Sequence, residues 1–282
     1  MTTELLTLAT SIALEAGELA ARRRREGVEV AATKSTVVDV VTEADREVEL
    51  LIRGRIADAR PGDGILGEEG GGQTGTSGLT WVVDPIDGTT NYLYGIPHYA
   101  VSIAVVEGEP DPQTWVDAVG VVHNPASGEL YAAAKGGGAT LVSTSSTTGR
   151  TGSTTELRIA DAVPLAEALV GTGFAYAAEM RGVQGAVATR LLPLIRDIRR
   201  QGTASLDLGF VAAGRLNAYY ERTLSPWDHA AGAIIAREAG AVVKGMGDAA
   251  PSRDFIIAGH PRLVAELEEL LAGFGIAEPP LA

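Results

Sequence analysis

The sequence predicts a mixed α/β fold, with an antiparallel sheet in its first half and an α/β arrangement in its second. Apolar residues recur at helical spacing through residues 3–25 and again from 43 to about 59. β-rich runs follow at 100–106, 118–122 and 128–133, as in an antiparallel sheet. From residue 168 onward, short strands alternate with helical stretches, and this order indicates an α/β second half.

Each element of the second half is short and separately recognisable. We expect strands and helices to alternate there in the order 168–172 (strand), 183–192 (helix), 197–200 (strand), 204–213 (helix), 218–221 (strand) and 226–239 (helix). Residues 143–155 contain almost only Ser, Thr and Gly, which cannot pack into a core. We therefore predict a flexible loop or linker at 143–155, between an N-terminal half (1–142) and a C-terminal half (156–282).

Composition limits the kinds of partner that the protein can have. Its 282 residues include no cysteine and carry a net charge of −13, which disfavours nucleic acid or an anionic membrane surface as the main partner. No apolar stretch approaches the roughly 20 residues that span a bilayer, and the N-terminus lacks a basic signal region. We expect a cytoplasmic protein. The arginine run 22–25 is either a basic patch or, as we favour, the solvated C-terminal end of the first helix.

The most informative motif is Asp84-Pro85-Ile86-Asp87-Gly88-Thr89-Thr90-Asn91, which follows the apolar run 81–83. Pro85 favours an extended Asp84, and Gly88 permits a sharp turn. Residues 89–91 can then begin a helix whose free N–H groups bind an anion. Carboxylates beside such a helix suit a phosphate bridged by a hard cation. The alternative is an Asp-Gly hairpin, but the residues that follow do not alternate like a return strand.

Further acidic residues stand in two other motifs. Glu68 and Glu69 lie in a Gly-Glu-Glu-Gly sequence, and Asp228 lies in Trp-Asp-His-Ala-Ala-Gly. Asp39 and Asp45 bracket an apolar pair upstream of both. With these motifs in this order, the chain resembles the inositol monophosphatase family of Mg²⁺-dependent, lithium-sensitive phosphatases. The similarity runs from the first helix to the last, and it implies a layered α-β-α-β-α sandwich.

The resemblance implies a metal-dependent phosphatase and names its ligands. Two or three Mg²⁺ ions would be held by Glu68, Asp84, Asp87 and Asp228, with the Ile86 carbonyl and the Thr89 hydroxyl completing the shell. Mg²⁺ prefers such oxygen ligands and keeps several waters. Paired ions stabilise both the attacking and the leaving oxygen of a phosphoryl transfer. Uncatalysed phosphate monoester hydrolysis is so slow that rate enhancements reach ~10²¹, so charge neutralisation by metal ions is an effect of the required size.

The same resemblance assigns roles to individual residues. Glu68 and Thr89 would orient and deprotonate the attacking water, with Asp45 accepting from Thr89, and the N–H groups of Gly88 and Thr89 would bind phosphate. Asp45 could instead be a surface acid paired with Arg46. Lys34 either resembles the family's loop lysine that organises waters or is only solvated. Glu69 supports either a third ion or only Glu68. Asp39 is a candidate structural residue. Asp228 could equally serve as an acidic residue in the first turn of a helix that begins at Ser225-Pro226.

Substrate recognition depends on analogy alone. Residues similar to the family's inositol contacts are Gly202, Thr203, Ala204 and Glu221. We expect hydrolysis of myo-inositol monophosphate, by a homodimer. Some members of the family have a histidine at the position of Ser225, so the resemblance does not assign the contacts to the leaving group. Fructose bisphosphate, a bisphosphorylated nucleotide and histidinol phosphate are alternative substrates, and a mainly RNA- or transcription-associated binding role is an alternative function.

Overall fold

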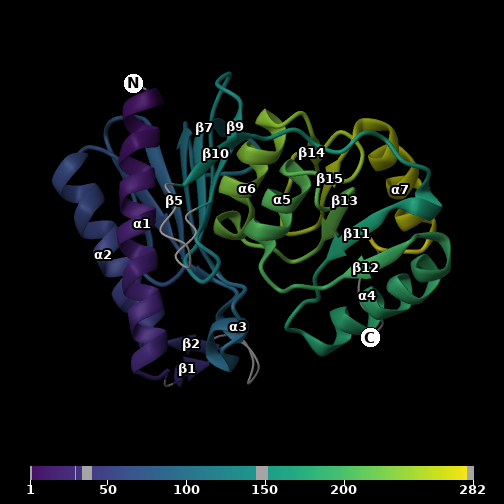
Figure 1. Ribbon diagram of the computed structural model, residues 1–282, viewed down its shortest axis with the longest axis horizontal. Coiled ribbons are helices and arrows are strands. Elements are labelled where there is room, and N and C mark those ends of the chain that lie inside the picture. The colour runs from purple at the N-terminus through teal and green to yellow at the C-terminus, as the bar shows by residue number, and fades with distance from the viewer. Residues whose placement is uncertain (1, 29, 34–39, 144–151, 278–282) are drawn as a thin grey trace.

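Helices and sheets alternate in layers in the computed structural model, which describes residues 2–28, 30–33, 40–143 and 152–277 (Figure 1). The helices are α1 (Thr2–Glu26), α2 (Glu43–Ala59), α3 (Thr89–Tyr94), α4 (Ala178–Leu191), α5 (Ala204–Ala212), α6 (Pro226–Glu238) and α7 (Pro261–Gly273), with single 3₁₀ turns η1 (Leu165–Glu167) and η2 (Leu192–Leu194).

Strands of the first half are β1 (Val30–Thr33), β2 (Val40–Thr42), β3 (Gly64–Gly67), β4 (Gly71–Gln73), β5 (Leu79–Asp87), β6 (Ala100–Glu107), β7 (Val116–Asn124), β8 (Glu129–Ala134), β9 (Ala139–Ser143) and β10 (Ser153–Glu156). Strands of the second half are β11 (Leu169–Thr172), β12 (Asp197–Arg199), β13 (Ala218–Glu221), β14 (Val242–Lys244) and β15 (Ile256–Gly259).

The layer order is the α-β-α-β-α sandwich that the sequence predicts. Helices α1 and α2 cover one face of an eight-stranded sheet, and α5 and α6 fill the space between that sheet and a five-stranded one (Figure 1). Helices α4 and α7 lie beyond the second sheet. The first sheet has the order β10-β9-β8-β7-β6-β5-β3-β4, and the second has the order β12-β11-β13-β15-β14.

Both sheets are mixed rather than uniform. The first sheet is antiparallel as expected, except that β3 runs parallel to β5. In the second, β11 is parallel to β12 and β13, whereas β15 is antiparallel to its neighbours. The helix expected at 183–192 begins earlier, at Ala178, where the N-cap Ala177 offers no capping side chain and so no signal in the sequence.

Strand β5 differs from the prediction in a way that matters for the site. The sequence suggested a strand that ends at Asp84, but β5 continues through Asp87, with an irregular register between these two acids. All nine residues of β5 are buried. Because the strand bends where pairing is interrupted, both carboxylates come to the same end of the sheet.

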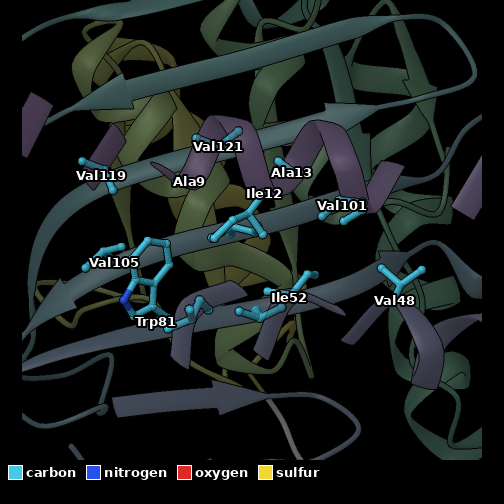
Figure 2. Packing of buried hydrophobic residues seen from close by; sticks show 14 of the residues in the cluster. Ala9, Ile12, Ala13, Val48, Ile52, Trp81, Val101, Val105, Val119 and Val121 are labelled. Carbon is cyan, nitrogen blue, oxygen red and sulfur yellow. The ribbon is translucent and has the colours of Figure 1, made fainter. Parts of the chain in front are cut away.

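A large apolar core holds α1 and α2 against the first sheet. Ile12, Ile52 and Trp81 are fully buried and meet between the helices and the strands (Figure 2). Burial of each side chain of this size stabilises the fold by about 1.5–3 kcal/mol. Trp81 also donates its indole N–H to Asp63 Oδ2 at 2.9 Å, so its polar atom is satisfied within the core.

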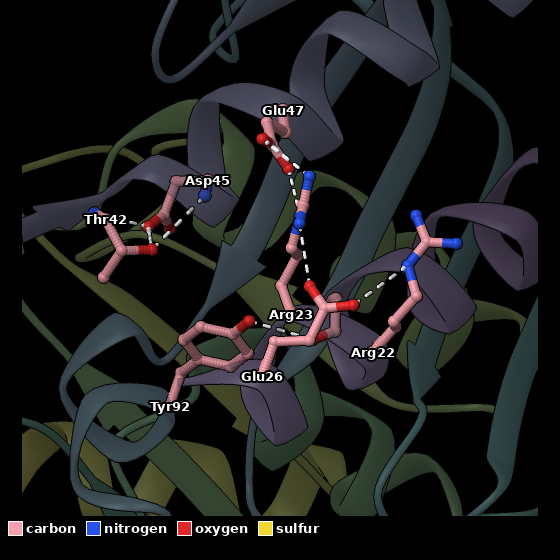
Figure 3. Close-up of polar contacts among 8 residues, drawn as sticks. Arg22, Arg23, Glu26, Thr42, Asp45, Glu47 and Tyr92 are labelled. Atoms are coloured by element: carbon pink, nitrogen blue, oxygen red, sulfur yellow. Dashed lines mark hydrogen bonds and ion pairs between the residues drawn. The ribbon is translucent and has the colours of Figure 1, made fainter. Parts of the chain in front are cut away.

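The basic run at the end of α1 is engaged within the fold. Arg23 pairs with Glu26 on its own helix at 2.7 Å and with Glu47 of α2 at 2.5 Å, and Arg22 lies 4.0 Å from Glu26 (Figure 3). These contacts agree with the reading of the run as a helix end, where cations offset the helix dipole.

The polar stretch at 143–155 joins paired strands at its two ends. Ser153–Glu156 forms β10, which pairs antiparallel with β9 and extends the first sheet. Residues 144–151 lie outside the described residues, so the division into halves at 142 and 156 stays a prediction. Within the described ranges, no helix has both the length and the apolarity needed to cross a bilayer.

Candidate active site

One cavity of about 550 Å³ opens between the two halves of the chain. The predicted site residues on its wall are Glu68, Asp84, Ile86, Asp87, Gly88, Thr89, Gly202, Thr203, Ala204, Glu221 and Asp228. They come from separate segments of the sequence, and the fold brings them together. Asp45 and Glu69 lie just behind this wall, whereas Lys34 and Asp39 fall outside the described residues.

The turn after β5 has the shape that the motif predicts. Asp84 Oδ1 accepts from the Ile86 N–H at 3.1 Å, and Gly88 has a φ of 91°, which side-chain-bearing residues rarely adopt. Helix α3 begins directly at Thr89, so the Asp-Gly hairpin alternative is wrong. A Cβ at Gly88 would also collide with the Thr203 hydroxyl, because the loop before α5 packs directly on this turn.

Asp87 is held by a residue that the sequence did not suggest. Its Oδ2 accepts hydrogen bonds from Ser205, from the backbone N–H at 2.8 Å and from the hydroxyl at 2.5 Å. Ser205 lies in the first turn of α5, so a carboxylate from β5 caps a helix of the second half. The separation of 118 residues explains why no local pattern could reveal the pair.

Asp228 combines the helix role that the sequence left open with a place in the cavity lining. It stands in the first turn of α6 and accepts a hydrogen bond from the Ser225 N–H at 2.6 Å, as a helix-capping acid does. The same side chain lines the cavity. Its structural role and its place in the site are therefore compatible.

The turn that carries Glu68 and Glu69 is supported from α2. Glu49, only 2% exposed, accepts from the N–H groups of Glu69 and Gly70, both at 2.7 Å. Arg53, one helical turn further on, donates to the same carboxylate at 2.7 Å. This pair was also missed, although a Glu followed four residues later by an Arg is a visible helical pattern.

Asp45 is a buried residue, so the alternative of a surface acid paired with Arg46 is wrong. It is 1% exposed, and its Oδ2 accepts from the Thr42 N–H at 2.7 Å and from the Thr42 hydroxyl at 2.5 Å (Figure 3). Arg46 instead pairs with Glu43. The Thr89 hydroxyl lies 3.3 Å from Asp45 Oδ1 and 3.2 Å from the Ile86 carbonyl oxygen, so it can donate to either.

Asn91 ties the two sides of the cavity together. Its amide nitrogen donates to the backbone carbonyls of His98 and Gln201, both at 2.8 Å. The Thr203 hydroxyl donates to the same His98 carbonyl at 2.9 Å. The turn after β5 and the loop before α5 are thereby fixed to each other, and the cavity wall at this point is rigid.

The cavity lining also includes residues that the predicted site set did not contain. Among them are Phe174, Tyr176, Arg200, Trp227 and Arg253. The loop that carries the first two is held from α4, because Arg181 donates to the Tyr176 carbonyl at 2.7 Å and Gln184 accepts from the Ala175 N–H at 2.8 Å.

Comparisons with known proteins agree with this geometry. The model of the inositol monophosphatase family matches residues 1–272. An inositol-1-monophosphatase of Mycobacterium leprae is 43% identical over 99% of this chain and 92% of its own length. A Nus factor SuhB of Xylella fastidiosa is 39% identical over 84% of this chain and 83% of its own. The solved structure of Mycobacterium tuberculosis SuhB is 41% identical, covers 99% of both chains and superposes with a TM-score of 0.80.

The chain belongs to the inositol monophosphatase family. It is a phosphoric monoester hydrolase, as the resemblance implied, and its family is metal-dependent. The family's motifs converge on the cavity and line it together, which makes the cavity the candidate site for this chemistry.

Electrostatics in this family member favour a cation in the cavity. Burial, together with neighbouring carboxylates such as Glu68, raises the pKa of Asp84 and of Asp228 well above the ordinary value. Burial also raises the pKa of Asp87 to about 7, although the hydrogen bonds from Ser205 oppose the shift. Clustered carboxylates of this kind are unfavourable when ionised alone, and a bound divalent ion reverses that balance.

The donor set fits Mg²⁺ rather than a closed structural ion site. Among the described residues, no three histidine, cysteine, aspartate or glutamate side chains are arranged so that they could hold a metal ion by themselves. Carboxylates at the cavity wall, the Ile86 carbonyl and the Thr89 hydroxyl are all hard oxygen donors. An open, oxygen-lined arrangement suits an ion that keeps waters and binds substrate phosphate.

Proposed function

We propose that this phosphatase hydrolyses phosphate monoesters of polyols, with myo-inositol monophosphate as the best substrate and two or three Mg²⁺ ions per site. The observation that carries the proposal is that Asp84, Asp87, Asp228 and Glu221 line the same cavity. Bound ions would polarise the phosphate and neutralise its charge. Glu68, Asp84, Asp87, Asp228 and the Ile86 carbonyl are the groups that would hold them.

The remaining groups bind, orient and accept protons. The N–H groups of Gly88 and Thr89, at the turn into α3, are positioned to bind phosphate oxygens. The Thr89 hydroxyl can donate its hydrogen bond to Asp45 or to the Ile86 carbonyl, which leaves its oxygen to accept a hydrogen bond from the attacking water. Glu68 at the cavity wall is the second acceptor for that water's proton.

Recognition of the polyol falls to cavity residues from the second half of the chain. Glu221 offers a carboxylate at the end of β13, where ring hydroxyls can donate to it. The backbone of the loop formed by Gly202, Thr203 and Ala204 can approach the substrate closely. Hydrogen bonds from Asn91 keep this loop in place.

A substrate panel tests the proposal. Release of inorganic phosphate should be fastest from myo-inositol 1-phosphate, compared with fructose 1,6-bisphosphate, adenosine 3′,5′-bisphosphate and histidinol phosphate. EDTA should abolish the activity and excess Mg²⁺ should restore it. Preference for one of the other esters would replace inositol phosphate as the substrate, and EDTA-resistant turnover would refute the metal role.

Three further properties stay predictions from family membership. Millimolar Li⁺ should inhibit turnover, the protein should be a homodimer by light scattering at micromolar concentration, and its location should be cytoplasmic.

A binding role in transcription is a second candidate, favoured by the similarity to the Nus factor SuhB of Xylella fastidiosa. The net charge of −13 opposes direct RNA contact. Fluorescence anisotropy with labelled RNA at 0.15 M salt measures that contact directly.

A further inference from the structure

We infer that Ser205 is a positioning residue that decides which oxygen of Asp87 faces the metal ions and thereby sets the affinity of the site for divalent cations. The inference deepens the proposed function, because it depends on Asp87 being a metal ligand. Ser205 itself does not lie on the cavity wall, whereas Asp87 does. Any effect of Ser205 on metal binding therefore has to pass through that carboxylate.

Both hydrogen-bond donors of Ser205 bind the same oxygen of Asp87. The Ser205 N–H at 2.8 Å and the Ser205 hydroxyl at 2.5 Å both donate to Asp87 Oδ2. Ser205 is fully buried and Asp87 is 8% exposed, so water does not compete freely for these bonds. Two donors on Oδ2 oppose rotation of the carboxylate, so Oδ1 is the oxygen that can bind an ion.

Helix α5 requires an acceptor at this point. Its N-cap residue, Thr203, makes no side-chain capping bond, because the Thr203 hydroxyl donates to the His98 carbonyl instead. The N–H groups of the first turn would otherwise be unsatisfied in a buried place. Asp87 supplies the acceptor, so one carboxylate serves both the helix and the proposed metal site.

Removal of the hydroxyl separates these two functions. Ser205→Ala retains the backbone donor, and the helix keeps its cap, but the carboxylate loses the second bond that fixes its orientation. Loss of a hydrogen-bond partner behind a metal ligand typically weakens metal binding about 10–100-fold. Because the backbone donors of Ser205 and Ala204 remain, we expect a loss of about tenfold, at the lower end of that range.

Mn²⁺ is a suitable probe, because free Mn²⁺ is counted directly by electron paramagnetic resonance. Metal-free wild type, Ser205→Ala, Ser205→Cys and Asp87→Asn are titrated with Mn²⁺ alone. The Cys variant keeps the side-chain size but donates weakly, so its affinity should fall between those of wild type and Ala. Thr189→Ala is the control: its hydroxyl also donates a hydrogen bond, but to the Gly185 carbonyl within α4 at 2.9 Å, and Thr189 does not line the cavity. Its Mn²⁺ affinity should stay within about twofold of wild type, as for a substitution away from the ligands.

Turnover supplies an independent second measurement. In Ser205→Ala, the Mg²⁺ concentration for half-maximal activity should rise about tenfold, while kcat at saturating Mg²⁺ stays close to wild type. A merely structural role would lower kcat and thermal stability without this shift.

The outcomes separate the inference from the proposed function. Wild-type or tighter Mn²⁺ binding by a folded Ser205→Ala protein overturns the inference alone, since the hydroxyl would then be idle or would compete with the ion. If Ser205→Ala does not fold, the Cys variant decides by the same criterion. If wild type binds no Mn²⁺, or Asp87→Asn binds it equally well, the proposed metal site itself is wrong.

Discussion

The Tyr219 hydroxyl donates a hydrogen bond to Glu221 Oε2 at 2.5 Å, between two residues on the same face of β13. Burial and the nearby carboxylate raise the pKa of Tyr219 well above its ordinary value, so the phenol remains a donor. Burial of the carboxyl group also raises the pKa of Glu221 to about 7, an effect that the Tyr219 bond opposes. Glu221 is thus oriented before any substrate arrives.

Glu221→Gln should change substrate choice more than it changes chemistry. Loss of a charged acceptor for a substrate hydroxyl costs roughly 1.5–3 kcal/mol, or about ten- to a hundredfold in kcat/KM. The loss should appear with myo-inositol 1-phosphate and be much smaller with p-nitrophenyl phosphate, which has no ring hydroxyls. Equal losses on both esters would show that Glu221 supports the fold or the ions instead.

Gly173→Ala, at the residue that follows β11, should reproduce that selectivity defect. A Cβ at Gly173 would collide with the Glu221 carboxylate and push it from its position. We expect a KM for the inositol ester at least several-fold higher, on the order of the effect of Glu221→Gln, with kcat on p-nitrophenyl phosphate little changed. Gly182→Ala, at a helical position with open space around it, is the control. Unchanged steady-state constants in Gly173→Ala would argue against a fixed Glu221.

Asp87→Asn should remove turnover without unfolding the protein. The amide oxygen can still accept from Ser205, and one charge fewer relieves repulsion among the buried carboxylates. We expect kcat to fall on the order of 10²-fold or more, as for loss of a central electrostatic group. Circular dichroism and thermal melting of the metal-free protein should show no loss of stability. Near-normal turnover by the folded variant would contradict the assignment.

Asp45→Asn should slow the reaction and leave metal affinity alone. Asp45 contacts Thr89 behind the cavity wall and does not line the cavity itself. A weaker acceptor for the Thr89 proton should lower kcat by up to about 10²-fold. The Mg²⁺ concentration at half-maximal activity should be unchanged, and this separates Asp45 from Asp87. A parallel rise in that concentration would mean that Asp45 shapes the ion site.

Asp63 does not line the cavity, and Asp63→Asn should destabilise the fold in a pH-dependent way. Burial alone would raise the pKa of Asp63, but hydrogen bonds from Arg60, Ser77 and Trp81 outweigh it and lower the pKa. A depressed pKa means that this stabilisation is complete above about pH 4, the unfolded value, and is lost as the pH falls through the folded value. We expect Asp63→Asn to cost roughly 1.5–3 kcal/mol in unfolding free energy at pH 7. In urea titrations, the difference in unfolding free energy between the variant and wild type should disappear below pH 4. A difference that stays constant with pH would contradict this linkage between protonation and stability.

Much of the fold and of the site could be predicted because its signals are local. Residues 81–91 carry a buried strand, a turn glycine and a helix start within one short stretch, and Gly88 adopts the expected positive φ. Helix α6 begins at Pro226, after the Ser225 that marks it in the sequence. Asp228 could be placed on the cavity wall from its motif and the resemblance.

Other parts of the site exist only through tertiary contacts. The bond between Asp87 and Ser205 spans 118 residues, and Glu49 supports the turn at Glu69 from a different element. Gly173 is needed because of a carboxylate on a neighbouring strand. Sequence patterns report the conformation of a residue and the face it buries, because these depend on near neighbours. Which donor meets which carboxylate depends on how the layers pack, so the sequence determined which acids line the cavity and the tertiary structure decided how they are held.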